Sequence, residues 1–197
     1  MPKIDAKTVV EHRASREQQI LEVATKLMRS TTSGELSLAA VAAEIGVTRT
    51  AIYKYFASAE ELRARIVTDS FAAWRALVET EVSKAESPEE KVRTFAAVSL
   101  RLAGSGAHHA AMIAGADGSI GALNLDERHA ELREPLSASL RELGVTNPEI
   151  EAELIDAAIG RGIELIDRGS DSGVVTTSIL GLIDRSISVQ PKKRERK

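Results

Sequence analysis

Residues 38–57, LAAVAAEIGVTRTAIYKYFA, constrain the fold of this chain more than any other stretch, because they predict two short helices joined at Gly46. Apolar residues recur at three- and four-residue steps from Leu38 to Ile45, as they do on one face of a helix. Ser37 stands just before this face, where its hydroxyl can cap the helix. Gly46 follows the face, where a left-handed residue ends a helix at no steric cost. The stretch therefore predicts two short helices that cross at a steep angle.

The second helix is expected to start after Thr48 and to keep polar side chains on its outer face. Ala51, Ile52 and Tyr55 are expected to point back at the first helix. The side chains left on the outer face are Arg49, Thr50, Tyr53 and Lys54. These side chains suit the phosphates and base edges of a DNA major groove. The pattern favours a helix-turn-helix motif over residues 38–57.

The run from Ile20 to Leu62 resembles the N-terminal DNA-binding domain of TetR/AcrR-type transcriptional regulators. The residues that carry the resemblance are Ile20-Leu21 with Ala24, Ser37-Leu38 with Val41-Ala42, Gly46-Val47-Thr48, Ile52-Tyr53 with Phe56, and Ser58 with Glu60-Glu61-Leu62. The resemblance implies an all-α fold of about nine helices. In that fold, an N-terminal three-helix helix-turn-helix DNA-binding domain precedes a helical ligand-binding and dimerisation domain.

The expected divisions of the chain are an N-terminal arm (1–14), the DNA-binding domain (15–60), the helical domain (61–190) and a basic tail (191–197). Residues 1–14 are expected to form either an arm or a frayed helical extension, and Ser15 to start the first clear helix. Ser58-x-x-Glu61 is a capping box that opens a long helix. Ser87-Pro88 and Asn147-Pro148 have the form of a cap followed by proline at the first helical position.

Two further helices are expected between these starts. A short apolar helix is predicted over residues 107–114, between glycine-rich breaks at 104–106 and 115–121. Another is predicted from about Leu123 to Leu143, and Pro135 should either kink it or start it afresh.

Composition supports a helical core and a cytoplasmic protein. Hydrophobic residues make up 43% of the chain but aromatic residues only 3%, so the core must be built from Ala, Leu, Ile and Val. The chain has no apolar run of about 18 residues that could span a membrane, and its first residues lack the apolar core of a signal peptide. With no cysteine, disulfides and thiolate zinc sites are excluded. The net charge is −3, yet residues 1–57 carry eight Lys and Arg against six Asp and Glu.

Catalytic chemistry finds little support in the sequence. Gly160-Arg161-Gly162 lacks the third glycine and the preceding strand of a dinucleotide-binding fingerprint. His108 and His109 are adjacent, so they lie about 100° apart around a helix and cannot easily coordinate the same ion. Asp126 and His129 share a helical face, but a third ligand is not evident. No catalytic residue, metal ligand or cofactor is predicted.

The resemblance implies roles for the residues of the motif. Phosphate contacts are expected from Ser37, Thr48, Tyr53, Lys54 and Tyr55, and base-edge contacts from Arg49 and Thr50. Relatives often carry Lys directly after the capping Ser, where this chain has Ala59. That difference predicts modest DNA affinity with a shallow salt dependence.

The resemblance also implies a small-molecule pocket and a dimer interface in the helical domain. The candidates for lining the pocket are Trp74, Phe95, Val98, Leu102, His109 and Met112. In the family, the last two helices of two subunits pair; the candidates here are Ile155, Ile159, Gly162, Ile163, Ile166, Ile179, Leu182 and Ile183. Burial within a single subunit is the alternative for both sets.

These features predict a homodimeric TetR-like repressor that binds a palindromic operator in double-stranded DNA and releases it on binding a small, mostly apolar ligand. One alternative is a regulator controlled by a protein partner, without a small-molecule pocket. Another is an all-helical enzyme that keeps a vestigial DNA-binding domain. Activation rather than repression stays open.

Overall fold

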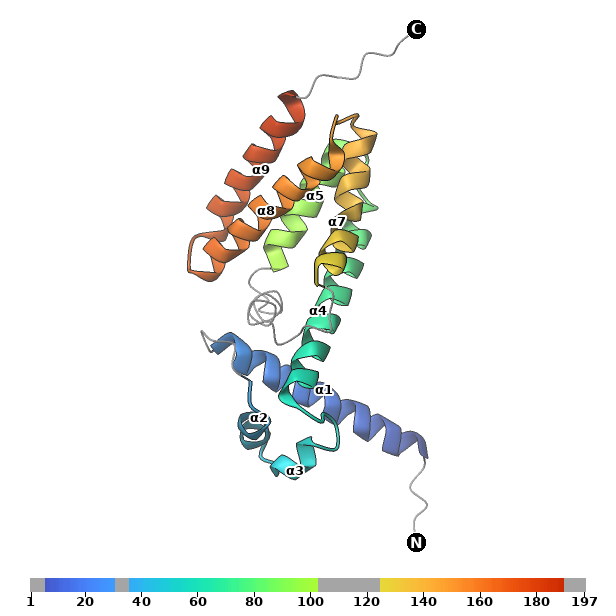
Figure 1. Ribbon diagram of the computed structural model, residues 1–197, viewed down its shortest axis with the longest axis vertical. Coiled ribbons are helices and arrows are strands. Elements are labelled where there is room, and N and C mark those ends of the chain that lie inside the picture. Colours follow the sequence, from blue (N-terminus) through green and yellow to red (C-terminus); the bar gives the residue numbers. More distant parts are fainter. Residues whose placement is uncertain (1–5, 31–35, 103–124, 190–197) are drawn as a thin grey trace. The chain divides into compact units, whose positions relative to one another are not determined.

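Every regular element in the described part of the chain is an α-helix (Figure 1). The computed structural model describes residues 6–30, 36–102 and 125–189. The helices are α1 (Ala6–Ser30), α2 (Leu38–Ile45), α3 (Arg49–Ile52), α4 (Ala59–Val82), α5 (Pro88–Leu102), α7 (Leu125–Glu142), α8 (Pro148–Asp167) and α9 (Ser172–Val189). The all-α prediction is confirmed, and these eight helices agree roughly with the nine expected. The helix predicted over 107–114 lies outside the described residues.

The chain divides into two compact units. Among the described residues, the N-terminal unit contains 6–30 and 36–69, and the C-terminal unit contains 70–102 and 125–189. Helix α4 contributes its first part to one unit and its last part to the other.

The N-terminal unit is built from the apolar stripe of α1 and the two short helices that follow. Helix α1 packs against α2, and α2 packs against α3. The buried side chains of this unit are Ile20, Leu21, Ala24 and Met28 of α1, Leu36, Leu38, Val41 and Ala42, Ile52 and Phe56, and Leu62, Ile66 and Val67 of α4. Because the aromatic content is low, aliphatic side chains fill almost all of this core.

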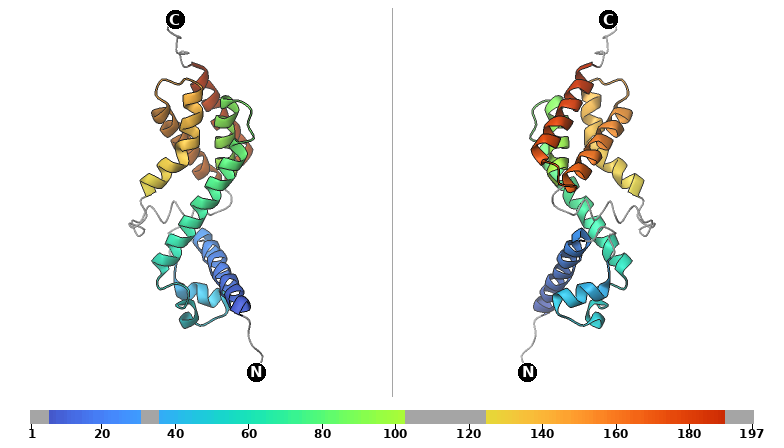
Figure 2. Two further views of the ribbon diagram at one scale, coloured as in Figure 1. Left: turned by 90° about the vertical axis from the view of Figure 1, so that its right-hand side faces the viewer. Right: turned by 90° about the vertical axis from the view of Figure 1, so that its left-hand side faces the viewer.

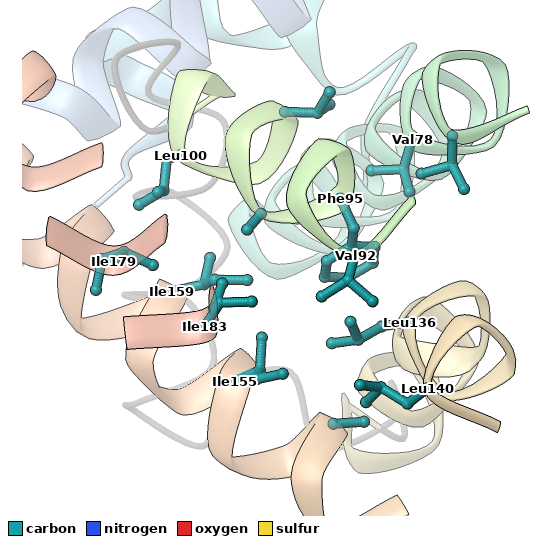
Figure 3. Close-up of a cluster of buried hydrophobic side chains, with 14 of the residues drawn as sticks. Val78, Val92, Phe95, Leu100, Leu136, Leu140, Ile155, Ile159, Ile179 and Ile183 are labelled. Atoms are coloured by element: carbon teal, nitrogen blue, oxygen red, sulfur yellow. The ribbon is translucent and has the colours of Figure 1, made fainter. Parts of the chain in front are cut away.

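The C-terminal unit has a larger aliphatic core (Figure 3). Helix α7 packs against α5 and α8, and α9 packs against α5 and α8 (Figure 2). Phe95 of α5 points into the centre of this core together with Leu136, Leu140, Ile155 and Ile183 (Figure 3). Each of these side chains is at most 4% exposed.

Several helix boundaries follow the capping signals in the sequence. The backbone N–H of Glu61 donates to Ser58 Oγ at 3.0 Å, and that of Glu90 donates to Ser87 Oγ at 3.1 Å. Helix α8 begins at Pro148 as expected, but the side chain of Asn147 makes no capping hydrogen bond.

For two helices the structure decides between the alternatives that the sequence left open. Helix α1 begins at Ala6 rather than at Ser15, so residues 6–14 are a helical extension and not a separate arm. These residues have no clean apolar stripe, so periodicity does not detect the helix there. Helix α7 continues through Pro135 as a single element and does not start afresh there.

Candidate nucleic-acid interface

Two capping hydroxyls and one glycine set the ends of α2 and α3: Ser37 caps the start of α2, and Gly46 and Thr48 lie in the turn between the two helices. Ser37 has an extended backbone, and its Oγ accepts from the N–H of Ala39 at 3.2 Å and of Ala40 at 3.4 Å. Gly46 has a φ of 77°, which is the left-handed conformation that glycine adopts without strain. Thr48 Oγ1 accepts from the N–H of Ala51 at 3.3 Å and caps α3. The capping roles predicted for these three residues are confirmed.

Most of the predicted contact residues are exposed around this turn. Ser37, Thr48, Arg49, Thr50, Tyr53 and Lys54 are exposed, whereas Tyr55 is half-buried. Since a hydroxyl both donates and accepts, Ser37 and Thr48 can cap their helices with the oxygen and still donate the proton outward. The exposed surface of α2 and α3 thus carries two hydroxyl donors, one at the start of each helix, together with two cations and the phenol of Tyr53.

The cations of the N-terminal unit differ in whether an acid neutralises them. Lys26 Nζ lies 3.0 Å from Glu44 Oε1. Arg65 pairs with Asp69 at 2.9 Å and with Glu17 at 3.0 Å. The hydrogen bond and charge of Asp69, together with Glu17, hold the pKa of Arg65 above its ordinary value.

No such acid faces the cations of the turn. Among the described residues, Arg49 and Lys54 have no acidic side chain within ion-pairing distance. Both side chains are exposed, so their charge is available to an anion. This contrast concentrates unneutralised positive charge at the turn.

Two of the arginines lie over tyrosine rings. The guanidinium carbon of Arg49 lies 5.3 Å from the centre of the Tyr53 ring, and both Nε and Nη2 of Arg49 donate to Tyr53 Oη. The guanidinium carbon of Arg13 lies 5.7 Å from the centre of the Tyr55 ring. The second contact joins residues 42 positions apart, so no local spacing in the sequence could have revealed it.

The predicted pocket residues lie in or beside the core of the C-terminal unit. Phe95 and Val98 are buried, and Trp74 and Leu102 are partly buried against the same core. The rings of Trp74 and Phe95 are 6.2 Å apart and tilted by 56°. The indole Nε1 of Trp74 is buried without a hydrogen-bond acceptor in the described part of the chain. His109 and Met112 lie outside the described residues, as do the glycine-rich breaks around them.

The predicted dimer residues lie mainly inside the protomer. Ile155, Ile159, Gly162, Ile163, Ile179 and Ile183 are buried, Ile166 is partly buried and Leu182 is exposed. Gly162 is tightly packed, because an added Cβ would lie 2.7 Å from Leu100 Cδ2. Six of the eight therefore fill the core of their own unit.

The outward faces of α8 and α9 carry a different set of apolar side chains, which we call the α8–α9 outer face. Its large members are Ile150 (59% exposed), Leu154 (62%), Val174 (65%) and Leu182 (51%). Ile150 and Leu154 share one face of α8, and Val174 and Leu182 share one face of α9. Because both helices contact α5 with their buried sides, both outward sides face away from α5.

No metal site emerges within the described ranges. Among these residues, no group of three or more His, Cys, Asp or Glu side chains is placed to hold an ion. The side chains of Asp126, His129, His108 and His109 lie outside the description. No helix in the described ranges is both long and apolar enough to cross a bilayer.

A capped helix, a left-handed glycine and a second helix with outward cations define a helix-turn-helix DNA-binding protein. Residues 20–66 match the sequence model of the family described as bacterial regulatory proteins, tetR family. This part of the chain is therefore a TetR-family DNA-binding domain. No curated protein matches it by sequence.

Solved structures share the fold over nearly their whole length. A structure concerned with the control of antibiotic production by bacterial hormones is 23% identical, with a TM-score of 0.72 over 87% of this chain and 97% of that one. The TetR-family regulator PfmR from Thermus thermophilus is 21% identical, with a TM-score of 0.67 over 84% and 97%. A TetR-like regulator from a Rhodococcus species is 20% identical, with a TM-score of 0.68 over 89% and 97%.

Proposed function

We propose that this regulator is a homodimeric repressor that binds a palindromic operator and leaves it when a small, mostly apolar ligand binds. The observation that carries the DNA-binding part is the unneutralised charge of Arg49 and Lys54 at a rigidly capped turn. Phosphates attract exposed cations that no protein acid has already neutralised. A regulator that binds chromosomal DNA in this way works in the cytoplasm.

Each residue of the turn has a role that its geometry supports. Ser37 and Thr48 donate their hydroxyl protons to phosphates, and Lys54 supplies charge. Arg49 and Thr50 stand at the start of α3, the end of a recognition helix that contacts base edges. Tyr53 adds a phosphate contact through its exposed phenol. Tyr55 adds a second, held under the guanidinium of Arg13.

Dimerisation is proposed through the α8–α9 outer face rather than through the buried isoleucines. One short recognition helix reads a single half-site, so a palindrome needs a second copy about 34 Å along the DNA. The large apolar side chains of this face on both helices stay exposed in the protomer. Packing against a second copy would remove them from water, which is favourable in proportion to the apolar area buried.

Ligand control is proposed from the indole of Trp74. A buried N–H without an acceptor costs about 1–3 kcal/mol, so a ligand that supplies an acceptor gains that bond on binding. The neighbouring ring of Phe95 and the core against which Trp74 packs are apolar. The proposed ligand is therefore an apolar molecule with one carbonyl, carboxylate or hydroxyl oxygen. The ligand releases DNA if it binds more tightly to a dimer conformation whose two DNA-binding domains no longer fit two half-sites, because the two binding equilibria are thermodynamically linked.

The test of DNA binding compares two lysines of the N-terminal unit. The full-length protein is titrated into a labelled duplex from the DNA upstream of its own coding region, over a series of salt concentrations. Lys54→Ala should weaken binding to every sequence about three- to tenfold and lower the salt slope by about one, as expected for one lost phosphate contact. Lys26→Ala is the matched control, because Glu44 already neutralises Lys26.

Fluorescence anisotropy gives the affinities. The assignment is contradicted if Lys54→Ala binds as the wild type does at every salt concentration. It is also contradicted if Lys26→Ala is equally harmful.

A further inference from the structure

The contact between Arg49 and Tyr53 is the most specific polar arrangement on the exposed face of the turn. Arg49 Nη2 lies 2.6 Å from Tyr53 Oη, and Arg49 Nε lies 3.1 Å from the same oxygen. The guanidinium also lies over the phenol ring. Arg49 is the first residue of α3, and Tyr53, four positions on, is its C-cap with a helical backbone, so the two side chains lie on one side of this turn of helix. The arrangement fixes a long side chain that would otherwise be mobile in water.

This contact uses one edge of the guanidinium and leaves the other. A guanidinium carries five N–H donors in a planar fork. The edge formed by Nε and Nη2 is bound to Tyr53, so the outer edge formed by Nη1 and the second Nη2 proton stays available. In the described part of the chain, no carboxylate pairs with Arg49. The outer edge is therefore a preorganised pair of donors on an exposed side chain.

Two parallel donors select one base in the major groove. Guanine presents two acceptors there, O6 and N7, which suit a bidentate arginine. Adenine presents an acceptor beside an amino donor, so it would accept only one of the two bonds. Thymine offers a single acceptor beside a methyl group, and cytosine offers a donor. The preorganised edge of Arg49 thus matches guanine and mismatches the other bases.

Tyr53 also keeps a group for the DNA backbone. A phenol oxygen has two lone pairs and one proton. The lone pairs accept from the cation, and the proton stays free to be donated to a phosphate. Because hydrogen bonds in a chain polarise one another, accepting from a guanidinium makes that proton a better donor. The phosphate contact and the base contact are therefore coupled through one oxygen atom.

We propose that Arg49 and Tyr53 act as one unit that reads a guanine in each half-site, with Tyr53 as the positioning residue of Arg49. The inference rests on the proposed function, because it requires this turn to enter the major groove. It adds the identity of the base that is read and the residue on which that reading depends. It also implies that substitutions of the two side chains have non-additive effects on the preference for that base.

The test selects duplexes from a pool with a randomised central region, using the full-length wild type and its variants. The wild type should enrich a palindrome with a fixed guanine in each half-site. Tyr53→Phe keeps the ring but removes the shared oxygen, so it should lower the preference for that guanine about tenfold, as expected for a lost bond to a charged group. The remaining positions of the site should stay unchanged.

The matched control is Tyr55→Phe, which removes the hydroxyl of the only other tyrosine in the chain. Its ring contacts Arg13 and not Arg49, so the guanine preference should not change. Arg49→Ala should abolish the preference, and adding Tyr53→Phe to it should cause no further loss at that position. Such non-additivity is the signature of two residues that act as a unit.

The outcomes separate this inference from the proposed function. If the wild type enriches no sequence, DNA binding itself is contradicted. If the wild type enriches a site and Tyr53→Phe keeps the full guanine preference, only the coupling is overturned. If the enriched site contains no guanine whose selection depends on Arg49, the inference about Arg49 and Tyr53 is overturned as well.

Discussion

The exposed face of α3 in the N-terminal unit is polar, whereas the α8–α9 outer face of the C-terminal unit is apolar. In the first, capping bonds and a left-handed glycine hold hydroxyls and cations at the surface. In the second, a core of isoleucine and leucine holds further apolar side chains on the opposite side of the same helices. The first surface suits a charged, hydrated partner, and the second suits a partner as apolar as itself.

The difference shows that binding depends on hydrogen-bond geometry at the surface of the N-terminal unit and on buried apolar area at the surface of the C-terminal unit. A polar contact surface depends on backbone geometry, since a misplaced hydroxyl or guanidinium loses its hydrogen bond. An apolar surface depends on area, which tolerates small displacements. A change of backbone conformation should therefore harm DNA binding by the N-terminal unit, whereas a charge introduced on the α8–α9 outer face should harm the contact made by the C-terminal unit.

The largest effect is expected from a charge on the α8–α9 outer face. Leu154→Asp places a carboxylate where a side chain 62% exposed in the protomer is proposed to be buried by a second copy. Burying an unpaired charge is costly, so the dissociation constant of the dimer should rise at least about a hundredfold. Sedimentation equilibrium measures the change.

The control for this variant is Ala76→Asp, which adds the same charge at an exposed position of α4 and should leave the dimer intact. Ile163→Asp, by contrast, should unfold the C-terminal unit, because Ile163 is only 4% exposed. An unchanged dimer in Leu154→Asp would place the interface elsewhere.

A smaller effect is expected from alanine at three glycines. Gly162→Ala should destabilise the fold by about 1–3 kcal/mol, because its Cβ would press against the buried Leu100. Gly160→Ala on the same helix meets no atom within 4 Å and should stabilise by up to about 1 kcal/mol through helix propensity. Gly46→Ala also meets no atom, but its φ of 77° should cost about 1–2 kcal/mol.

Urea unfolding at a fixed protein concentration gives the three values. The comparison of the units predicts that only Gly46→Ala also weakens DNA binding. If Gly162→Ala and Gly160→Ala have the same free energy of unfolding, the close contact at Gly162 does not affect stability.

The smallest effect is expected in the emission of Trp74, the single tryptophan of the chain. Straight-chain fatty acids and aromatic carboxylates are suitable probes, because each joins an apolar body to one acceptor group. A probe that accepts from Nε1 should shift the emission and raise the melting temperature. Trp74→Phe should weaken its binding about fivefold, measured as the probe concentration needed to release DNA.

Phe71→Trp in the Trp74→Phe background is the control, since it restores an indole one turn away on α4. If no probe changes the emission or the melting temperature, a regulator controlled by a protein partner becomes the better proposal.

The sequence predicted the N-terminal unit in detail, because its geometry is set by local signals. Ser37, Gly46 and Thr48 act within four residues of their positions, so spacing alone predicts what they do. The hydrogen bond from Arg49 to Tyr53 is also local, but the periodicity gives no sign of which rotamers the two side chains adopt. The contact of Arg13 with Tyr55 depends on tertiary packing and was not predictable.

The α8–α9 outer face shows why the rest could not be predicted. The apolar band of α8 is wide enough to bury against two surfaces at once. Periodicity does not say which side meets the protomer's own core, and the structure places Ile155, Ile159 and Ile163 there. Ile150 and Leu154, on the other side, have the same chemical character. The packing of α5 and α7 against α8 distinguishes the two sides.

The scarcity of aromatic residues has a practical consequence for how the two units are observed. Both tyrosines, Tyr53 and Tyr55, lie in the N-terminal unit, and Trp74 lies in the C-terminal unit. Each unit therefore carries its own intrinsic chromophore, and selective excitation of the indole reports on the C-terminal unit alone. Denaturation followed at the two absorption bands can reveal, without any label, whether the units melt together or one before the other.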